Sequence, residues 1–400
     1  MSHLNFKSLP LNETILRVVE ELKFNQPTDI QEQAIPKIIK GQSLVGQSQT
    51  GSGKTHAYLL PIFNKIDKER QGVQFVITAP TRELCQQIYR EVRKIIELSG
   101  KQSEWFAQLL IGGEEKQLSK STKRLPHIIV GTPKRILSLI NDHVLSIYTA
   151  ETFVIDEADL MVDLGFIEEI DQLLVRSKKD VQVLAFSATI PEKLQHFFNK
   201  YLNQPVYVEL NDQLFPETLE HHLIARKHRE ASDLIYSLSQ VFQPYLALIF
   251  TNGKGEADEL ALSLQRAGLN VGYIHGGLTP RERNRVLREI NNLRYQYIVA
   301  TDLASRGIDI EGVSHVINAQ MPKEEHFYVH RVGRTARAGM PGTAISFYDE
   351  GDLSLIDSLE RKNVNFNYVD IRDKEWVKAR RMDSRSRQRS TKKGKGKQKR

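Results

Sequence analysis

The stretch SQTGSGKT carries a lysine, two glycines and several hydroxyl side chains at the spacing of a phosphate-binding loop. It departs from the pattern G-x-x-x-x-G-K-[ST] at its first position, where serine replaces glycine. Apolar residues before it predict a short strand, and KTHAYLLPIF after it predicts a helix. A glycine-rich loop in that setting points backbone N–H groups at phosphate. The alternative is a Gly-Ser turn that happens to precede a lysine. The candidate nucleotide-binding residues are Ser48, Gln49, Thr50, Gly51, Ser52, Gly53, Lys54 and Thr55.

A second group of reactive side chains follows the apolar run TFVI, in the sequence TFVIDEAD. Asp156 at the tip of such a strand can hold a Mg²⁺ ion together with the Thr55 hydroxyl. Glu157 is placed to orient and deprotonate an attacking water. Taken alone, the motif could also be an acidic cap between a strand and a helix. Together with a phosphate loop in this order, it indicates nucleotide hydrolysis, with Lys54 reaching the outer phosphates.

A third group is cationic. HRVGRTAR spaces Arg331, Arg334 and Arg337 three residues apart, so a helix would direct them broadly to one side. The alternative is a solvated basic helix, which Gly333 and Gly339 make a weak explanation.

These groups need a scaffold, and the chain alternates β-branched apolar runs with amphipathic helical stretches. The runs at residues 43–46, 74–79, 105–112, 127–131, 152–156 and 183–188, and at 246–250, 271–274, 297–301, 315–318 and 342–347, predict strands. Helical patterns lie between them, for example at residues 82–98. Strands separated by helices predict an α/β fold with two parallel-sheet domains. The polar stretch at residues 209–217 is the expected linker.

Composition narrows the class of protein. The chain of 400 residues is 40% hydrophobic and 26% charged, which is typical of a globular protein. We expect a cytoplasmic protein, because no run is long enough for a membrane helix, no secretion signal is visible and only one cysteine is present. Residues 372–400 hold 14 Lys or Arg against 3 acidic residues. This tail has no apolar face and is expected to be disordered and to bind a polyanion, although a merely solubilising role is the alternative.

The motifs SQTGSGKT, TFVIDEAD, SAT and HRVGRTAR, in this order, closely resemble those of the DEAD-box RNA helicases. The resemblance covers both α/β halves. It implies two tandem RecA-like domains with ATP between them and single-stranded RNA across both. The implied arrangement is an adenine-recognition segment at residues 1–33, an ATP-binding domain at 34–208, a linker at 209–217, a second domain at 218–367 and a disordered basic tail at 368–400.

The resemblance also implies roles for single residues. Phe24 would stack on adenine, Gln31 would select ATP and Thr28 would support that loop, although Lys23 stands where the family usually has glycine. Asp309 would sense the nucleotide, and Arg334 and Arg337 would contact the γ-phosphate. Coupling between the domains would use Asp159, Ser187, Thr189 and His330. The implied RNA contacts are Pro80, Thr81, Arg82, Gly113, Thr132, Arg135, Thr251, Gly276, Arg283 and Thr301.

Together with these residues, the resemblance implies an ATP- and Mg²⁺-dependent RNA helicase that separates short duplexes locally or remodels RNA–protein complexes. We expect a monomer. The candidate RNA contacts combine cations with hydroxyl and backbone donors, which suits binding that is independent of base sequence. Two alternatives remain open. One is a DNA translocase of the wider helicase superfamily. The other is an RNA clamp or annealing chaperone in which hydrolysis only times release.

Overall fold

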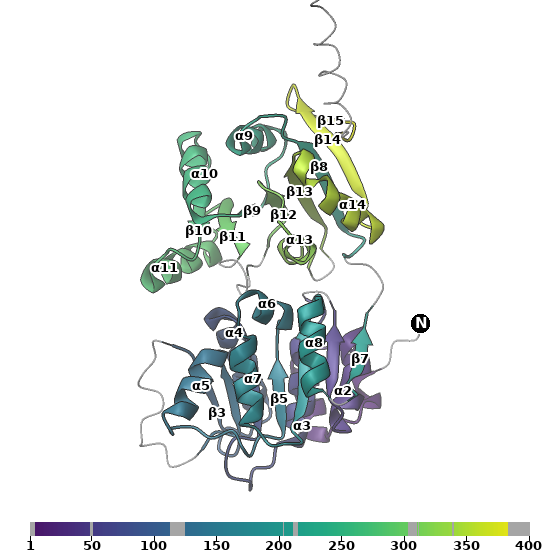
Figure 1. The fold of residues 1–400 in the computed structure, drawn as a ribbon, viewed down its shortest axis with the longest axis vertical. Helices are drawn as coiled ribbons and strands as arrows, with labels where there is room; N and C mark the ends of the chain where they lie inside the picture. The colour runs from purple at the N-terminus through teal and green to yellow at the C-terminus, as the bar shows by residue number, and fades with distance from the viewer. Residues whose placement is uncertain are drawn as a thin grey trace, which may run out of the picture. The chain divides into compact units, whose positions relative to one another are not determined.

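The computed structural model describes residues 5–48, 51–112, 125–202, 204–210, 215–302, 310, 312–337 and 340–382. The chain divides into two compact units, residues 1–212 and 213–400, here called domain 1 and domain 2 (Figure 1). The division falls inside the stretch expected as the linker. Gln49, Thr50, Gly113 and Asp309, four of the predicted site residues, lie outside the described residues.

Domain 1 is built on a parallel sheet with the strand order β3-β4-β2-β5-β6-β1-β7. Its strands are short, and β2, β4, β5 and β6 are fully buried because helices cover both faces of the sheet, whereas the edge strands β3 and β7 are partly exposed. The strands are β1 Leu44–Gln47, β2 Phe75–Thr78, β3 Ala107–Leu110, β4 Ile128–Gly131, β5 Thr152–Ile155, β6 Gln182–Ser187 and β7 Val206–Glu209.

The helices of domain 1 form two layers, each over its own hydrophobic core. One core lies under η1 to α4, and the other lies under α5 to α8. The helix predicted at residues 82–98 is confirmed, and its Ile88, Val92, Ile95 and Ile96 are buried on one face. The elements are η1 Phe6–Ser8, α1 Glu13–Glu21, α2 Asp29–Ile39, α3 Lys54–Lys65, α4 Arg82–Leu98, α5 Pro133–Asn141, α6 Ala158–Asp163, α7 Ile167–Val175 and α8 Glu192–Tyr201.

Domain 2 has the strand order β10-β11-β9-β12-β13-β8-β14-β15. Counted from the first strand of each domain, the first seven positions repeat the order of domain 1. All pairs are parallel except β14 with β15. The strands are β8 Leu219–Ala225, β9 Ala247–Thr251, β10 Val271–Ile274, β11 Tyr297–Thr301, β12 His315–Asn318, β13 Gly342–Tyr348, β14 Phe366–Arg372 and β15 Glu375–Lys378. The helical elements are α9 Ala231–Val241, α10 Lys254–Arg266, α11 Pro280–Asn291, α13 Glu325–Val332, η2 Glu350–Asp352 and α14 Leu353–Arg361.

The structure corrects the expected start of the tail. Residues 368–382 were assigned to a disordered tail, but they complete β14, form β15 and end in a docked segment. Arg229 holds Asp370 at 2.8 Å, and Arg381 pairs with Asp357 and Glu360 of α14. The sequence did not reveal these ordered elements, because the charged residues that suggested disorder are the ones that form the ion pairs and the edge strand β15.

Strands β7 and β8 were also not predicted, since they flank the polar linker and β8 contains a His-His pair. No helix in the described ranges combines the length and hydropathy that crossing a membrane requires.

Candidate functional site

The predicted phosphate loop follows β1 and leads into α3. The Ser48 N–H donates to the Ser187 carbonyl of the neighbouring β6 at 3.1 Å, which holds the loop to the sheet. Gly53 caps α3 in the left-handed region, with φ of 92°. The Lys54 side chain is buried, and its Nζ donates to the Ser48 carbonyl at 2.8 Å. A buried ammonium at a helix start, next to left-handed glycines, is a suitable receptor for phosphate.

Ser48, the variant first residue of the loop, is buried, and its Oγ lies 2.7 Å from the Ser52 Oγ across the loop. The extra hydroxyl therefore has a partner within the motif. A small side chain is accommodated here without the backbone freedom of glycine.

The adenine-recognition segment is joined directly to the phosphate loop. The Thr28 N–H donates to the Gln31 Oε1 at 3.1 Å, and the Gln31 Nε2 donates to the Gly53 carbonyl at 3.1 Å. Both ends of the Gln31 amide are thus engaged, and Thr28 and Gln31 form a capping box at the start of α2. The structure brings these predicted residues together against Gly53.

We expect Gly53→Ala to weaken ATP binding by about tenfold, through strain of about 1–2 kcal/mol at a left-handed position. A Cβ on Gly53 would also lie 2.5 Å from the Gln31 Nε2 and 2.8 Å from the Thr28 Oγ1. Gly41→Ala is the matched control, since Gly41 has φ of 81° and open space around it. Titration of a fluorescent ATP analogue should show weaker binding only for Gly53→Ala, whereas unchanged affinity would contradict this account of Gly53.

Phe24 is half-buried between two other rings. It stacks on Phe6 with centroids 6.4 Å apart, and it meets the edge of His56 at 4.9 Å. Lys23, before it, adopts the left-handed conformation with φ of 58°. This backbone explains why glycine suits the position. The lysine keeps the same turn at the expense of some strain.

Lys23→Gly should therefore raise the free energy of unfolding. Relief of left-handed strain contributes about 1–2 kcal/mol, and the greater chain entropy of glycine removes roughly 0.5–1 kcal/mol of that gain. Lys23→Ala removes the same charge but keeps the strain, so it should give no gain in a urea titration. Equal stability of the two variants would show that the backbone is not strained at this residue.

The carboxylate half of the site stands at the end of β5, two strands away from β1 across β6. Asp156 is buried, and its Oδ2 accepts a hydrogen bond from the Tyr58 hydroxyl at 2.8 Å. Burial, together with the charge of Glu157, raises the pKa of the Asp156 carboxyl to about 6, although Lys54 acts to lower it. The carboxyl is therefore a negative charge that burial leaves poorly compensated.

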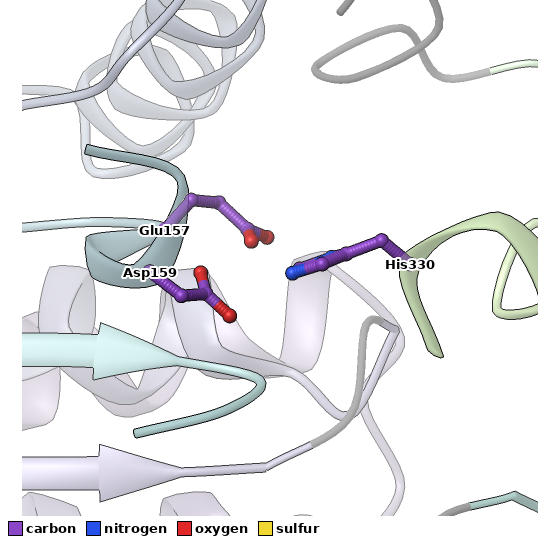
Figure 2. A group of neighbouring side chains, drawn as sticks. All are labelled: Glu157, Asp159 and His330. Carbon is purple, nitrogen blue, oxygen red and sulfur yellow. The ribbon is translucent and has the colours of Figure 1, made fainter. Parts of the chain in front are cut away.

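Glu157 and Asp159 both leave the turn that starts α6 (Figure 2). The backbone of Glu157 is left-handed, with φ of 50°, which is rare for a residue with a side chain and is found most often at functional sites. His330, also labelled there, belongs to α13 of domain 2.

A magnesium ion fits the donor atoms of this site. Asp156 offers a buried carboxylate whose ionised form a cation would stabilise, and Thr55 offers a hydroxyl from the first turn of α3. Oxygen donors of this kind are those that Mg²⁺ prefers.

Asp159 connects the end of β5 with the SAT segment after β6. The Asp159 Oδ2 accepts from the Thr189 N–H at 3.0 Å and from the Thr189 hydroxyl at 2.9 Å. The Ser187 Oγ accepts from the Asp159 N–H at 3.0 Å and donates to the Thr189 carbonyl at 2.7 Å. The structure thus brings together the three predicted coupling residues of domain 1.

The predicted RNA contacts of domain 1 lie on the other half of the same sheet edge, after β3, β4 and β2. Pro80 follows β2, while Thr81 and Thr132 cap the N-termini of α4 and α5. Arg82 is exposed with its guanidinium against Gly112, and Arg135 is half-buried in α5. The backbone N–H groups at the starts of α4 and α5, together with the Arg82 guanidinium, offer hydrogen-bond donors for phosphate.

Lys134, on α5 between Thr132 and Arg135, has an exposed side chain that nevertheless contacts two groups of domain 1. Its Nζ lies 3.7 Å from the Glu169 carboxylate and 5.2 Å from the centre of the Phe166 ring. This cation is therefore already engaged within domain 1.

Domain 2 places its predicted RNA contacts in the same way as domain 1, at or after the ends of β10, β11 and β9. Thr251 and Thr301 end β9 and β11, and they are paired in register on adjacent strands. Gly276 is exposed shortly after β10, and Arg283 lies on α11. The same three positions in the strand order thus carry the predicted RNA contacts in both domains.

The cationic motif does not present its arginines together. Helix α13 ends at Val332 with Gly333 as its C-cap, so Arg334 and Arg337 lie in the turns that follow. Arg331 is buried within domain 2. It binds Asp302 and Asn252 through its side chain, with 2.7 Å from Nη2 to the Asn252 Oδ1. The expectation that one helix would direct all three to one side is wrong, because glycine ends the helix.

Two residues that the sequence did not single out emerge from these contacts. Tyr58 orients Asp156, and its position four residues after Lys54 in α3 was an available signal. Asp302 holds Arg331 and directly follows β11, although nothing in the local pattern marks it as a partner of a residue so distant in sequence.

Comparisons with known proteins agree with this geometry. Residues 28–197 match the DEAD/DEAH box helicase family, and residues 226–339 match the helicase conserved C-terminal domain. The chain is 48% identical to the DEAD-box ATP-dependent RNA helicase CshB of Bacillus cereus, over 94% of this chain and 87% of that protein. Identity to CshB of Bacillus subtilis is 47%, over 98% and 89%.

Solved structures show the same similarity. S. cerevisiae Dbp5, bound to RNA and ADP BeF3, has a TM-score of 0.80 and 27% identity, covering 91% of this chain and 95% of that one. Mss116p bound to ssRNA and AMP-PNP has a TM-score of 0.79 and 25% identity, covering 93% and 81%.

Proposed function

Because this chain belongs to the family of DEAD-box ATP-dependent RNA helicases, we propose that it hydrolyses ATP when RNA is bound and thereby separates short RNA duplexes locally, or remodels RNA–protein complexes. The observation that supports this proposal most directly is the arrangement of the candidate residues along one edge of the domain 1 sheet. Its β1-β6-β5 half holds the lysine and the carboxylates, and its β3-β4-β2 half holds helix starts and Arg82.

In this proposal each group of the first half has one task. Phe24 and Gln31 bind adenine, and Lys54 with the loop N–H groups binds the phosphates. Thr55 and Asp156 would hold Mg²⁺, which neutralises charge on the phosphates during transfer. Glu157 deprotonates the attacking water, and Arg334 and Arg337 of domain 2 stabilise the charge that develops on the γ-phosphate.

The RNA contacts support binding without base specificity. The described candidates are four threonines, three arginines, a proline and a glycine, whose hydroxyl, guanidinium and backbone donors favour phosphates and 2′-hydroxyls. S. cerevisiae Dbp5 and Mss116p, the similar structures named above, were solved with RNA.

Strand displacement tests the local, non-processive mode. With ATP, the protein should separate a short RNA duplex and leave a duplex several times longer intact, whatever single-stranded overhang is present. Equal rates on both lengths would point to a translocase. Net annealing of complementary strands, with no separation at any ATP concentration, would favour the RNA clamp or annealing chaperone.

Removing residues 383–400 should leave RNA-stimulated hydrolysis in place but weaken RNA binding. The segment holds nine Lys or Arg. Each lost phosphate contact on single-stranded RNA should lower the slope of log affinity against log salt by about 0.7. The deletion leaves the docked Arg381 intact. Filter binding across a salt series checks this, and loss of all stimulation would favour a scaffold driven by the tail.

A further inference from the structure

Phe215, near the C-terminal end of the stretch expected as the linker, is buried in domain 2. Its ring centroid lies 4.7 Å from that of His221 on β8 and 5.9 Å from that of Tyr328 on α13. It belongs to the same hydrophobic core as Tyr328. The end of the linker is therefore attached to α13 as well as to the sheet.

The rings that surround Phe215 also contact one another, so they form a continuous aromatic cluster. The His221 Nδ1 and the Tyr328 hydroxyl are hydrogen-bonded at 2.9 Å, and Phe366 of β14 packs edge-on against both rings. Burial lowers the pKa of His221 to about 4, so this ring stays neutral and tolerates its apolar surroundings. Rings packed edge to face resist sliding, which fixes the orientation of their elements.

Helix α13 is held at its start, where Glu325 accepts a hydrogen bond from Ser358 of α14, and at two further places near its C-terminal end. The cluster holds it at Tyr328, and Arg331 holds it to Asp302 and Asn252 at the ends of β11 and β9. His330 lies between these two points, and Arg334 follows directly after the helix. A shift of the cluster would thus move the residues to which the proposed function assigns γ-phosphate contacts.

We propose that Phe215 is a positioning residue for hydrolysis, which locks the domain 2 end of the linker onto α13 and so sets where Arg334 and Arg337 stand. This inference rests on the proposed function. Phe215 touches neither nucleotide nor RNA in this account. Its effect on the rate arises because the displacement of a reacting group by a fraction of an ångström is costly in rate.

Comparison of Phe215→Ala with Phe366→Ala tests the proposal in the full chain. Both changes remove one ring from contact with His221 and Tyr328, but only Phe215 borders the linker. We expect Phe215→Ala to lower the RNA-stimulated kcat by about tenfold with little change in the KM for ATP, measured well below the melting temperature. Phe366→Ala should lower Tm but leave kcat within about twofold. Phe215→Leu should recover most of the rate.

Hydrogen exchange gives a second readout that does not depend on activity. The amides of α13, Glu325–Val332, should exchange faster in Phe215→Ala than in Phe366→Ala. Equal exchange and equal kcat in the two variants would overturn the positioning role. If the unchanged protein showed no RNA-stimulated hydrolysis, the proposed function would fail, and the exchange comparison alone would decide on Phe215.

Discussion

Replacing Glu157 with glutamine should leave ATP binding intact and lower the RNA-stimulated kcat by about 10²–10⁴-fold, the range that loss of a general base produces. The glutamine keeps the size of the side chain and can adopt the same left-handed backbone at the start of α6. It also removes the negative charge next to Asp156, which lowers the pKa of that carboxyl, so metal binding should not suffer.

Single-turnover hydrolysis with saturating RNA, together with titration of a fluorescent ATP analogue, separates these effects. Glu168→Gln removes the same charge from the exposed first turn of α7 and serves as the control. Hydrolysis by Glu157→Gln at the rate of the control would show that Glu157 is not the base.

Arg334→Ala should reduce turnover by about 10³–10⁵-fold, as the loss of an arginine acting on a transferring phosphate does. Its affinity for ATP should stay nearly unchanged, because the residues assigned to ATP binding, apart from Asp309, lie in domain 1. Arg334 follows the C-cap of α13, so the change does not interrupt the helix.

Arg361→Ala, at the exposed end of α14, is a control for loss of a cation from domain 2. Steady-state kinetics of both variants with RNA should show a loss of kcat for Arg334→Ala alone. A normal kcat with a raised KM for ATP would mean that Arg334 contributes to ground-state binding rather than to phosphoryl transfer.

Most of the fold could be predicted from the sequence, because the parallel strands are buried on both faces and therefore appear in the sequence as unbroken apolar runs. Strand β5, TFVI, is fully buried, and its predicted bounds differ from the observed ones by one residue. The elements that were missed have polar or charged residues. Strand β8 contains His221 and His222, and β15 contains Glu375 and Lys378. Their stability comes from partners distant in sequence, which a local pattern does not reveal.

The candidate site divides in the same way. Lys54 and Asp156 were predicted from local motifs, since the chemistry of each depends on residue type and spacing, whereas the role of Gln31 came only from the family resemblance. The Tyr58 contact with Asp156 and the Arg331 contact with Asp302 depend on how strands and helices are placed side by side. The left-handed backbone of Lys23 likewise follows from the turn that joins α1 to the adenine-recognition segment, and lysine gives no signal of it.

The strand order that both domains share gives a physical reason why the proposed nucleotide binding and the proposed RNA binding occur in one chain. In both domains, the first three strands in the sheet order end at the proposed RNA contacts. In domain 1, the strands β5, β6 and β1 end at the proposed nucleotide residues, whereas the proposed cations of domain 2, Arg334 and Arg337, lie between α13 and β13. Under the proposed assignments, the nucleotide and RNA residues of domain 1 share one sheet edge, so a change in nucleotide would alter RNA binding through neighbouring strands.

The central claim is that RNA is the ligand that switches on ATP hydrolysis. The most direct test measures the steady-state rate of phosphate release with no nucleic acid, with single-stranded RNA and with single-stranded DNA of the same sequence, each at saturating ATP and Mg²⁺. We predict strong stimulation by RNA and a rate with DNA close to that of the protein alone. Equal stimulation by DNA and RNA, or a rate that neither changes, would contradict the account.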